Sequence, residues 1–103
     1  MNTSGLKKED MQLMKNAFAQ FPEVREVRIF GSRAMGNFKP GSDVDLALFG
    51  KGELACTTRI SGILNEELPL PYLFDVVDYH AIQSQDLKKH IDQYGQVIYK
   101  RSC

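Results

Sequence analysis

The sequence predicts a single α/β domain in which helices flank a small mixed β-sheet. The 103 residues suffice for one hydrophobic core and little more. Amphipathic segments with helical spacing alternate with segments rich in β-branched and aromatic residues, the order typical of a layered α/β fold. No internal repeat, low-complexity run or linker divides the chain, so we expect one domain over residues 1–103.

The first two elements are expected to be a helix over residues 5–20 and a strand over residues 24–30. In the helical segment, apolar side chains recur at spacings of three, four and seven, so they would form one stripe with charged side chains opposite. Pro22 then ends the helix. The segment VREVRIF alternates at its start and contains several β-branched residues, which favours a strand.

Glycines separate this strand from the next one. Gly36 and Gly41 interrupt regular structure between the two strands. The sequence DVDLALFG at residues 43–50 then alternates between two faces, and it predicts a second strand that ends at Gly50.

The later part of the chain predicts two more helices and one more strand. Residues 53–67 place apolar side chains at largely helical spacing. The β-branched and aromatic run over residues 72–79 predicts the third strand. Residues 84–94 predict a short helix with Ser84 as its N-cap, and residues 96–100 form a last extended piece.

The charge balance and the apolar patterning exclude some classes of partner. Lys plus Arg and Asp plus Glu number 13 each, so we expect neither a long phosphate-tracking surface nor a nucleic-acid partner. No apolar run approaches the roughly 20 residues that span a bilayer, and the first residues are charged where a signal peptide is apolar. We therefore expect no membrane partner and a cytoplasmic location. His80 and His90 have no partner at metal-ligand spacing, and the sequence assigns them no role.

Two aspartates stand at the start of the predicted second strand. Side chains two positions apart on a strand share a face, so Asp43 and Asp45 project together and Val44 points the other way. Two neighbouring carboxylates repel each other, and a divalent cation relieves that repulsion. Magnesium takes one or two protein carboxylates together with water and phosphate oxygens. The pair predicts a site for a metal-bound nucleotide; the alternative is a strand-start turn with Asp45 facing solvent.

The third strand offers two further aspartates, Asp75 and Asp78. Their positions have opposite parity, so only one of them can share the face of the metal site. Asp75 lies in the middle of an apolar strand, where a carboxylate needs a partner or a function, whereas Asp78 is expected near the strand end and solvent. Asp75 is therefore the predicted third ligand.

The turn after the first strand carries Gly31 and Ser32. Gly31 allows close backbone approach, while the Ser32 hydroxyl and the amides of a helix start are donors for phosphate oxygens. Arg33 adds positive charge. A Gly-Ser pair alone is usually only a turn, but its position before the acidic strand makes residues 31–33 candidates for nucleotide binding.

Gly31-Ser32, ten intervening residues and Asp43-Val44-Asp45 together resemble the signature of the DNA polymerase β-type nucleotidyltransferase superfamily. The short chain resembles the minimal nucleotidyltransferase branch over nearly its whole length. The resemblance implies the nucleotidyltransferase fold, with Gly31 and Ser32 holding a nucleoside triphosphate. It also implies that Asp43, Asp45 and Asp75 bind two Mg²⁺ ions, and that Asp75 helps to deprotonate the attacking hydroxyl.

The same resemblance implies a reaction and a partner. The reaction is transfer of a nucleoside monophosphate to a hydroxyl with release of pyrophosphate, and the family favours ATP as the donor. The minimal branch resembles partners of small helical HEPN proteins in toxin-antitoxin pairs, some of which transfer AMP to a tyrosine of the HEPN protein. We therefore expect an adenylylating antitoxin.

Two alternatives to this expectation remain open. The chain could be a non-catalytic module that neutralises a partner by contact alone, because apolar and aromatic side chains occur near both ends of the sequence. These side chains are Phe18, Phe21, Tyr94, Ile98 and Tyr99. It could also be a transferase that acts on a small molecule or an RNA end.

Overall fold

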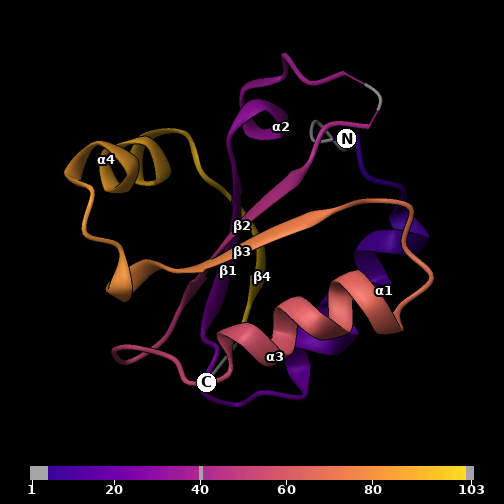
Figure 1. Ribbon diagram of the computed structural model, residues 1–103, viewed down its shortest axis with the longest axis horizontal. Helices are drawn as coiled ribbons and strands as arrows, with labels where there is room; N and C mark the ends of the chain where they lie inside the picture. The colour runs from indigo at the N-terminus through magenta and orange to yellow at the C-terminus, as the bar shows by residue number, and fades with distance from the viewer. Residues whose placement is uncertain (1–4, 40, 102–103) are drawn as a thin grey trace.

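The computed structural model describes residues 5–39 and 41–101. Its elements in chain order are α1 (Lys8–Ala19), β1 (Glu26–Phe30), α2 (Ser32–Met35), β2 (Val44–Phe49), α3 (Thr57–Gly62), η1 (Ile63–Glu67), β3 (Phe74–Asp78), η2 (Tyr79–Ala81), α4 (Gln85–Tyr94) and β4 (Gln96–Lys100). The four strands form one sheet in the order β3-β2-β1-β4 (Figure 1). This arrangement confirms the predicted α/β class with a mixed sheet.

Helices cover both faces of the sheet, as Figure 1 shows: α1 and α3 lie on one side and α4 on the other. The larger apolar cluster lies between the sheet and the helices α1 and α3. Its fully buried side chains include Phe18, Leu46 and Ile60. The smaller cluster consists of Phe30, Ala47 and Ile91, and it joins α4 to β1 and β2. Apolar side chains of the helices therefore pack against both faces of the sheet.

The strand register brings three chain segments to one end of the sheet. β1 and β2 are antiparallel, and Phe30, the last residue of β1, lies opposite Asp45. β2 and β3 are parallel, and Asp45 lies beside Asp75. The end of β1 and the starts of β2 and β3 therefore meet, and they carry the residues that the sequence analysis selected.

The predicted helix over residues 53–67 is wrong in its start and in its form. Regular α-helix begins only at Thr57; residues 53–56 form a loop and a turn, in which the Leu54 N–H donates to the Asp78 carboxylate (2.6 Å). From Ile63 to Glu67 the helix widens into a π-helix. There the Asn65 amide pairs with the backbone of Phe74, donating to its carbonyl (3.0 Å) and accepting from its N–H (2.8 Å). Asn65 thereby occupies the open edge of β3.

The other elements match their predicted bounds to within a few residues, and the predicted extended piece over residues 96–100 is β4. The helix predicted over residues 5–20 is α1, the strand predicted over residues 24–30 begins at Glu26, and the strand predicted over residues 72–79 is β3. The predicted cap of the last helix is confirmed, since the Ser84 hydroxyl accepts from the Leu87 N–H. In the two described ranges, no helix has both the length and the apolar character needed to cross a bilayer.

Candidate active site

Gly31 links the end of β1 to the short helix α2 in a conformation that favours glycine. Its φ is 74° and its ψ is −152°, a region that residues with a Cβ rarely adopt. A Cβ placed at this position would overlap Oδ2 of Asp45. The Gly-Ser turn and the acidic strand are therefore in direct contact, and Ser32 follows at the first position of α2.

Three carboxylates gather beside this turn. Asp43 is exposed immediately before β2, Asp45 is half-buried within β2, and Asp75 is exposed on β3. Asp45 and Asp75 are register partners on parallel strands, so their side chains share one face of the sheet. Val44 and Leu46, which alternate with Asp45, are fully buried on the opposite face.

The surroundings of Asp45 raise the pKa of its carboxyl group above the ordinary value. Burial is the largest cause, followed by the negative charges of Asp75 and Asp43, and His90 acts in the opposite direction. A carboxylate with a raised pKa beside two others indicates local negative charge that a cation would neutralise. The three aspartates therefore act on one another electrostatically.

The donor set fits magnesium completed by a nucleotide. Within residues 5–39 and 41–101, no three acidic, histidine or cysteine side chains group tightly enough to enclose a metal ion unaided. Mg²⁺ prefers hard oxygen ligands, keeps several waters and commonly takes only one or two protein carboxylates plus phosphate oxygens. Asp43, Asp45 and Asp75 supply oxygen donors only, beside a turn suited to phosphate. The number of ions stays a prediction.

Asp78 binds backbone N–H groups and does not join the other three carboxylates. Contrary to the expectation that solvent is close, its side chain is buried, and the carboxylate accepts from the N–H groups of Leu54 (2.6 Å) and His80 (3.1 Å). Its register partner on β2 is Leu48, three positions beyond Asp45 and fully buried. The structure thus keeps Asp78 apart from the other carboxylates.

Arg33 is buried, although the sequence analysis made it a candidate for contact with the nucleotide. Only 3% of its surface is exposed, and its Nε and Nη2 atoms donate to the Ser42 carbonyl at 3.2 and 2.9 Å. The guanidinium lies over the rings of Phe38 (4.9 Å) and Tyr72 (5.3 Å). These contacts hold the residue before Asp43, so Arg33 orders the segment that presents the first carboxylate.

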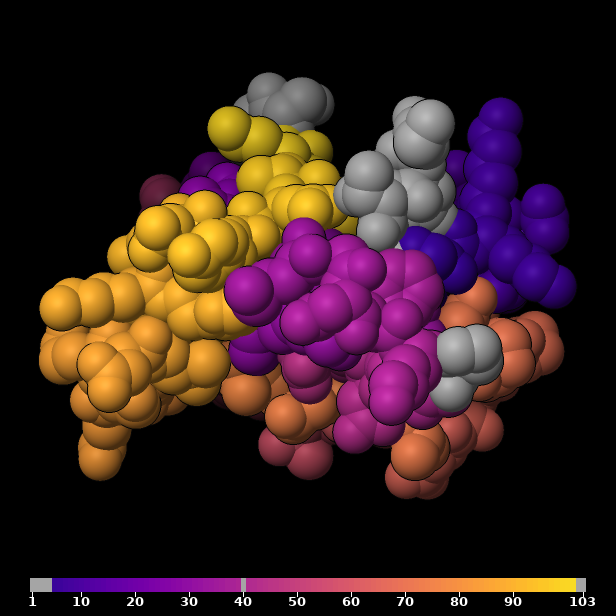
Figure 2. Space-filling model, turned by 90° about the horizontal axis from the view of Figure 1, so that it is seen from above, coloured from indigo at the N-terminus to yellow at the C-terminus, as the bar shows by residue number. Residues whose placement is uncertain are grey.

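His90 is the residue at this site that the sequence analysis missed. The Gly31 N–H donates to its Nε2 atom at 3.0 Å. No motif connects the two positions, because they are 59 residues apart and meet only when α4 packs on the sheet. Figure 2 shows this end of the molecule: the segment from the end of β1 through α2, in magenta, lies beside the α4 segment in orange.

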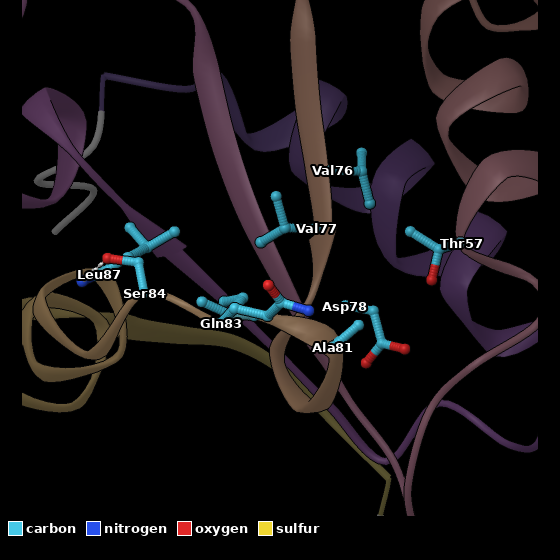
Figure 3. Close-up of a pocket in the computed structure, with 9 residues that line it drawn as sticks. Thr57, Val76, Val77, Asp78, Ala81, Gln83, Ser84 and Leu87 are labelled. Atoms are coloured by element: carbon cyan, nitrogen blue, oxygen red, sulfur yellow. Dashed lines mark hydrogen bonds between the residues drawn. The ribbon is translucent and has the colours of Figure 1, made fainter.

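A separate depression of about 430 Å³ lies at the edge of β3 (Figure 3). Its wall is largely apolar and includes Val76, Val77 and Leu87, with Thr57 and Asp78 among the polar side chains. None of the residues that line it is a predicted site residue. Because the Asp78 carboxylate is already engaged by two backbone N–H groups, this depression is less suited to a metal-bound nucleotide than the surface beside Gly31.

Comparison with known sequences gives a family. Residues 12–103 match the family described as "Polymerase beta, Nucleotidyltransferase". The match includes the Gly-Ser turn, the acidic pair and β3. No curated protein is similar enough to count as a relative.

Comparison with solved structures supports the fold. A chain in the crystal structure of a toxin-antitoxin with AMP-PNP has a TM-score of 0.71 and 19% identity, covering 94% of this chain and 76% of that chain. A chain in the structure of a tri-AMPylated Shewanella oneidensis HEPN toxin in complex with MNT antitoxin has a TM-score of 0.61 and 19% identity. The match covers 88% of this chain and 73% of that chain. A putative nucleotidyltransferase from Sulfolobus solfataricus has a TM-score of 0.51 and 23% identity, and the match covers 94% of this chain and 92% of that chain. At these identities the likeness shows a shared fold.

Proposed function

The chain belongs to the polymerase beta nucleotidyltransferase family, and on that premise we propose that it transfers AMP from ATP to a hydroxyl of a HEPN partner protein and thereby acts as an antitoxin. One observation carries the proposal: Asp45 lies beside Asp75 in register and against Gly31, so the proposed metal ligands adjoin the turn that we propose for phosphate binding. This is the arrangement that a metal-bound triphosphate requires.

The reaction assigns a task to each group. The acceptor oxygen forms a bond to the α-phosphorus, the bond from that phosphorus to the oxygen bridging to the β-phosphate breaks, and pyrophosphate leaves. Gly31 and Ser32 would hold the triphosphate, while Asp43, Asp45 and Asp75 would hold Mg²⁺. The bound metal supplies charge neutralisation at the phosphates. Asp75, which is exposed, would accept the proton of the attacking hydroxyl.

One observation supports an acceptor on a separate molecule, and a second supports a protein as that molecule. The described residues are taken up by one sheet and its helices, so we place the acceptor hydroxyl on another molecule. The structural neighbours include toxin-antitoxin complexes, among them one with AMP-PNP and one with a tri-AMPylated HEPN toxin. We also propose two Mg²⁺ ions per site and a cytoplasmic location, where ATP and Mg²⁺ are available.

A double-label experiment tests the type of transfer. The purified chain and its HEPN partner are incubated with Mg²⁺ and either α-labelled or γ-labelled ATP. Nucleotidyl transfer leaves the α-label on the partner and no γ-label, whereas phosphoryl transfer leaves the γ-label. The Asp43→Asn/Asp45→Asn variant should give no label. Asp86→Asn removes an exposed acidic residue of α4 and should label normally. Absence of label with every nucleoside triphosphate would refute the proposal.

Neutralisation by contact alone is the second candidate function. Among residues 5–39 and 41–101, the exposed large apolar side chains are Met35, Leu73, Tyr94 and Val97. Of the side chains that first suggested this alternative, Phe18 is fully buried and Tyr94 is exposed. If Asp43→Asn/Asp45→Asn still neutralises the partner as well as the wild type does, contact explains the effect and transfer does not.

A further inference from the structure

His90 joins α4 to the turn that follows β1. The Gly31 N–H donates to its Nε2 atom at 3.0 Å, so this nitrogen acts as the acceptor. The imidazole ring also lies near the rings of Phe30 (6.0 Å between centroids) and Tyr94 (5.4 Å). The adjacent Ile91 is fully buried against β1 and β2, so the helix that carries His90 is firmly attached to the sheet.

This hydrogen bond acts on the peptide that leads into Gly31, whose backbone conformation is constrained. Gly31 adopts a conformation close to glycine-only territory, and its α-carbon lies against the Asp45 carboxylate. The direction of the Gly31 N–H sets the plane of the peptide that connects Phe30 to Gly31. A tilt of that plane would move the start of α2 relative to Asp45.

We propose that His90 is a positioning residue of the nucleotide site: by accepting the Gly31 N–H, it fixes the orientation of the turn that receives the triphosphate. The proposal rests on the proposed function, because it assigns the turn to a triphosphate. His90 acts through Gly31, and direct contact with the nucleotide is not part of its role. A histidine that only packed α4 onto the sheet would affect folding but leave nucleotide affinity unchanged.

Three variants separate these roles. His90→Phe keeps a ring against Phe30 and Tyr94 but removes the acceptor. His90→Gln removes the ring and keeps an acceptor at similar reach. His80→Phe is the matched control, because the His80 Nε2 atom also lies beside a glycine, 3.1 Å from the Gly50 carbonyl oxygen, at the far end of β2.

Calorimetric titration with AMP-PNP and Mg²⁺ gives the affinities. We expect His90→Phe to weaken binding about three- to tenfold, the effect of one net hydrogen bond, and His90→Gln to stay within about twofold of the wild type. His80→Phe should bind normally. In the transfer assay, His90→Phe should raise the KM for ATP and leave kcat nearly unchanged.

A spectroscopic measurement tests the contact without relying on activity. In wild-type protein labelled with ¹⁵N, we expect a scalar coupling across the hydrogen bond between the Gly31 nitrogen and Nε2 of His90. This coupling should be lost in His90→Phe. If that variant does not fold, His90→Asn replaces it, because its shorter amide does not reach Gly31.

The outcomes distinguish the inference from the function on which it rests. If the wild type binds AMP-PNP and His90→Phe binds it equally well, the inference is wrong and the proposed function stands. The same holds if His90→Gln loses as much affinity as His90→Phe, or if the wild type shows no coupling. If the wild type binds no nucleoside triphosphate, the proposed function fails and the inference fails with it.

Discussion

Gly31 and Asp45 lie so close together that a side chain at position 31 would overlap the Asp45 carboxylate. The glycine combines a positive φ with direct contact to a carboxylate oxygen. Gly36, five positions later, also has a positive φ (81°), but no atom lies within 4 Å of a Cβ placed there. Gly31 therefore combines a nearly glycine-only backbone region with a close approach to Asp45, whereas Gly36 adopts the left-handed helical region (ψ 4°) beside open space.

Gly31→Ala is predicted to cost more stability than Gly36→Ala. Gly36→Ala places alanine in the left-handed helical region, at a cost of about 1 kcal/mol, whereas Gly31→Ala combines a less favourable backbone region with overlap at Asp45, for a total of about 2–3 kcal/mol. Denaturant unfolding of both variants measures the difference. Equal losses would mean that the Gly31–Asp45 contact does not constrain position 31.

Asp45→Asn is predicted to stabilise the protein in the absence of metal while removing its function. Burial and the charges of Asp75 and Asp43 raise the pKa of Asp45 in the folded state, so this state binds more protons than the unfolded state in the window above the ordinary value of 3.8. Wild-type stability should fall as the pH rises through that window. At neutral pH and without metal, Asp45→Asn should therefore be more stable than the wild type.

Magnesium should reverse this order. A ligand that binds the folded state raises its stability, so Mg²⁺ with AMP-PNP should raise the Tm of the wild type and leave that of Asp45→Asn unchanged. Thermal unfolding between about pH 4 and pH 7, with and without Mg²⁺ and AMP-PNP, measures both effects. A variant less stable than the wild type at neutral pH without metal would contradict the account of Asp45.

At the scale of elements, β3 carries two aspartates with opposite tasks. Asp75 is exposed beside Asp45, and Asp78 is buried under the backbone that leads into α3. The alternation of side chains along a strand predicted that only one could join the site. The burial of Asp78 was not predictable, because it depends on the loop before α3, where the Leu54 N–H turns toward it.

The two aspartates therefore give a matched pair of variants. Asp78→Asn should lower the free energy of unfolding by about 1–3 kcal/mol, because an amide cannot accept from both N–H groups as the carboxylate does. Its folded fraction should still transfer AMP. Asp75→Asn should change stability by less than about 0.5 kcal/mol but slow transfer about 100-fold or more.

Unfolding curves and single-turnover transfer rates for both variants test this assignment. A large loss of transfer per folded molecule in Asp78→Asn, with normal transfer in Asp75→Asn, would show that Asp78 takes part in transfer and Asp75 does not. The hydrogen bonds of Asp78 to Leu54 and His80 argue against that result.

The sequence predicted most strands and helices because their signals are local. Alternation placed β2, β-branched residues placed β1 and β3, and Ser84 marked the start of α4. The segment before α3 and the π-helix were not predictable in this way. Both depend on contacts with β3, through Asp78 and Asn65, and such contacts do not appear in the spacing of apolar residues.

At the scale of the whole molecule, the site joins four segments that are far apart in sequence. The Gly-Ser turn, the acidic pair and Asp75 could be selected from the sequence because motif spacing and strand parity are short-range properties. His90 and the burial of Arg33 could not, because they depend on how α4 packs on the sheet and how the segment around Ser42 folds over α2. The apolar cluster of Phe30, Ala47 and Ile91 makes that packing possible.

The central claim is that this site places AMP on a HEPN partner, and the intact mass of the co-expressed partner tests it most directly. With the wild-type chain, the account predicts a mass increase of one or more AMP groups on the partner. With Asp43→Asn/Asp45→Asn it predicts the unmodified mass, although the two proteins still purify together. An unmodified partner that is nevertheless neutralised by the wild type would contradict the claim, and it would assign the protein to neutralisation by contact.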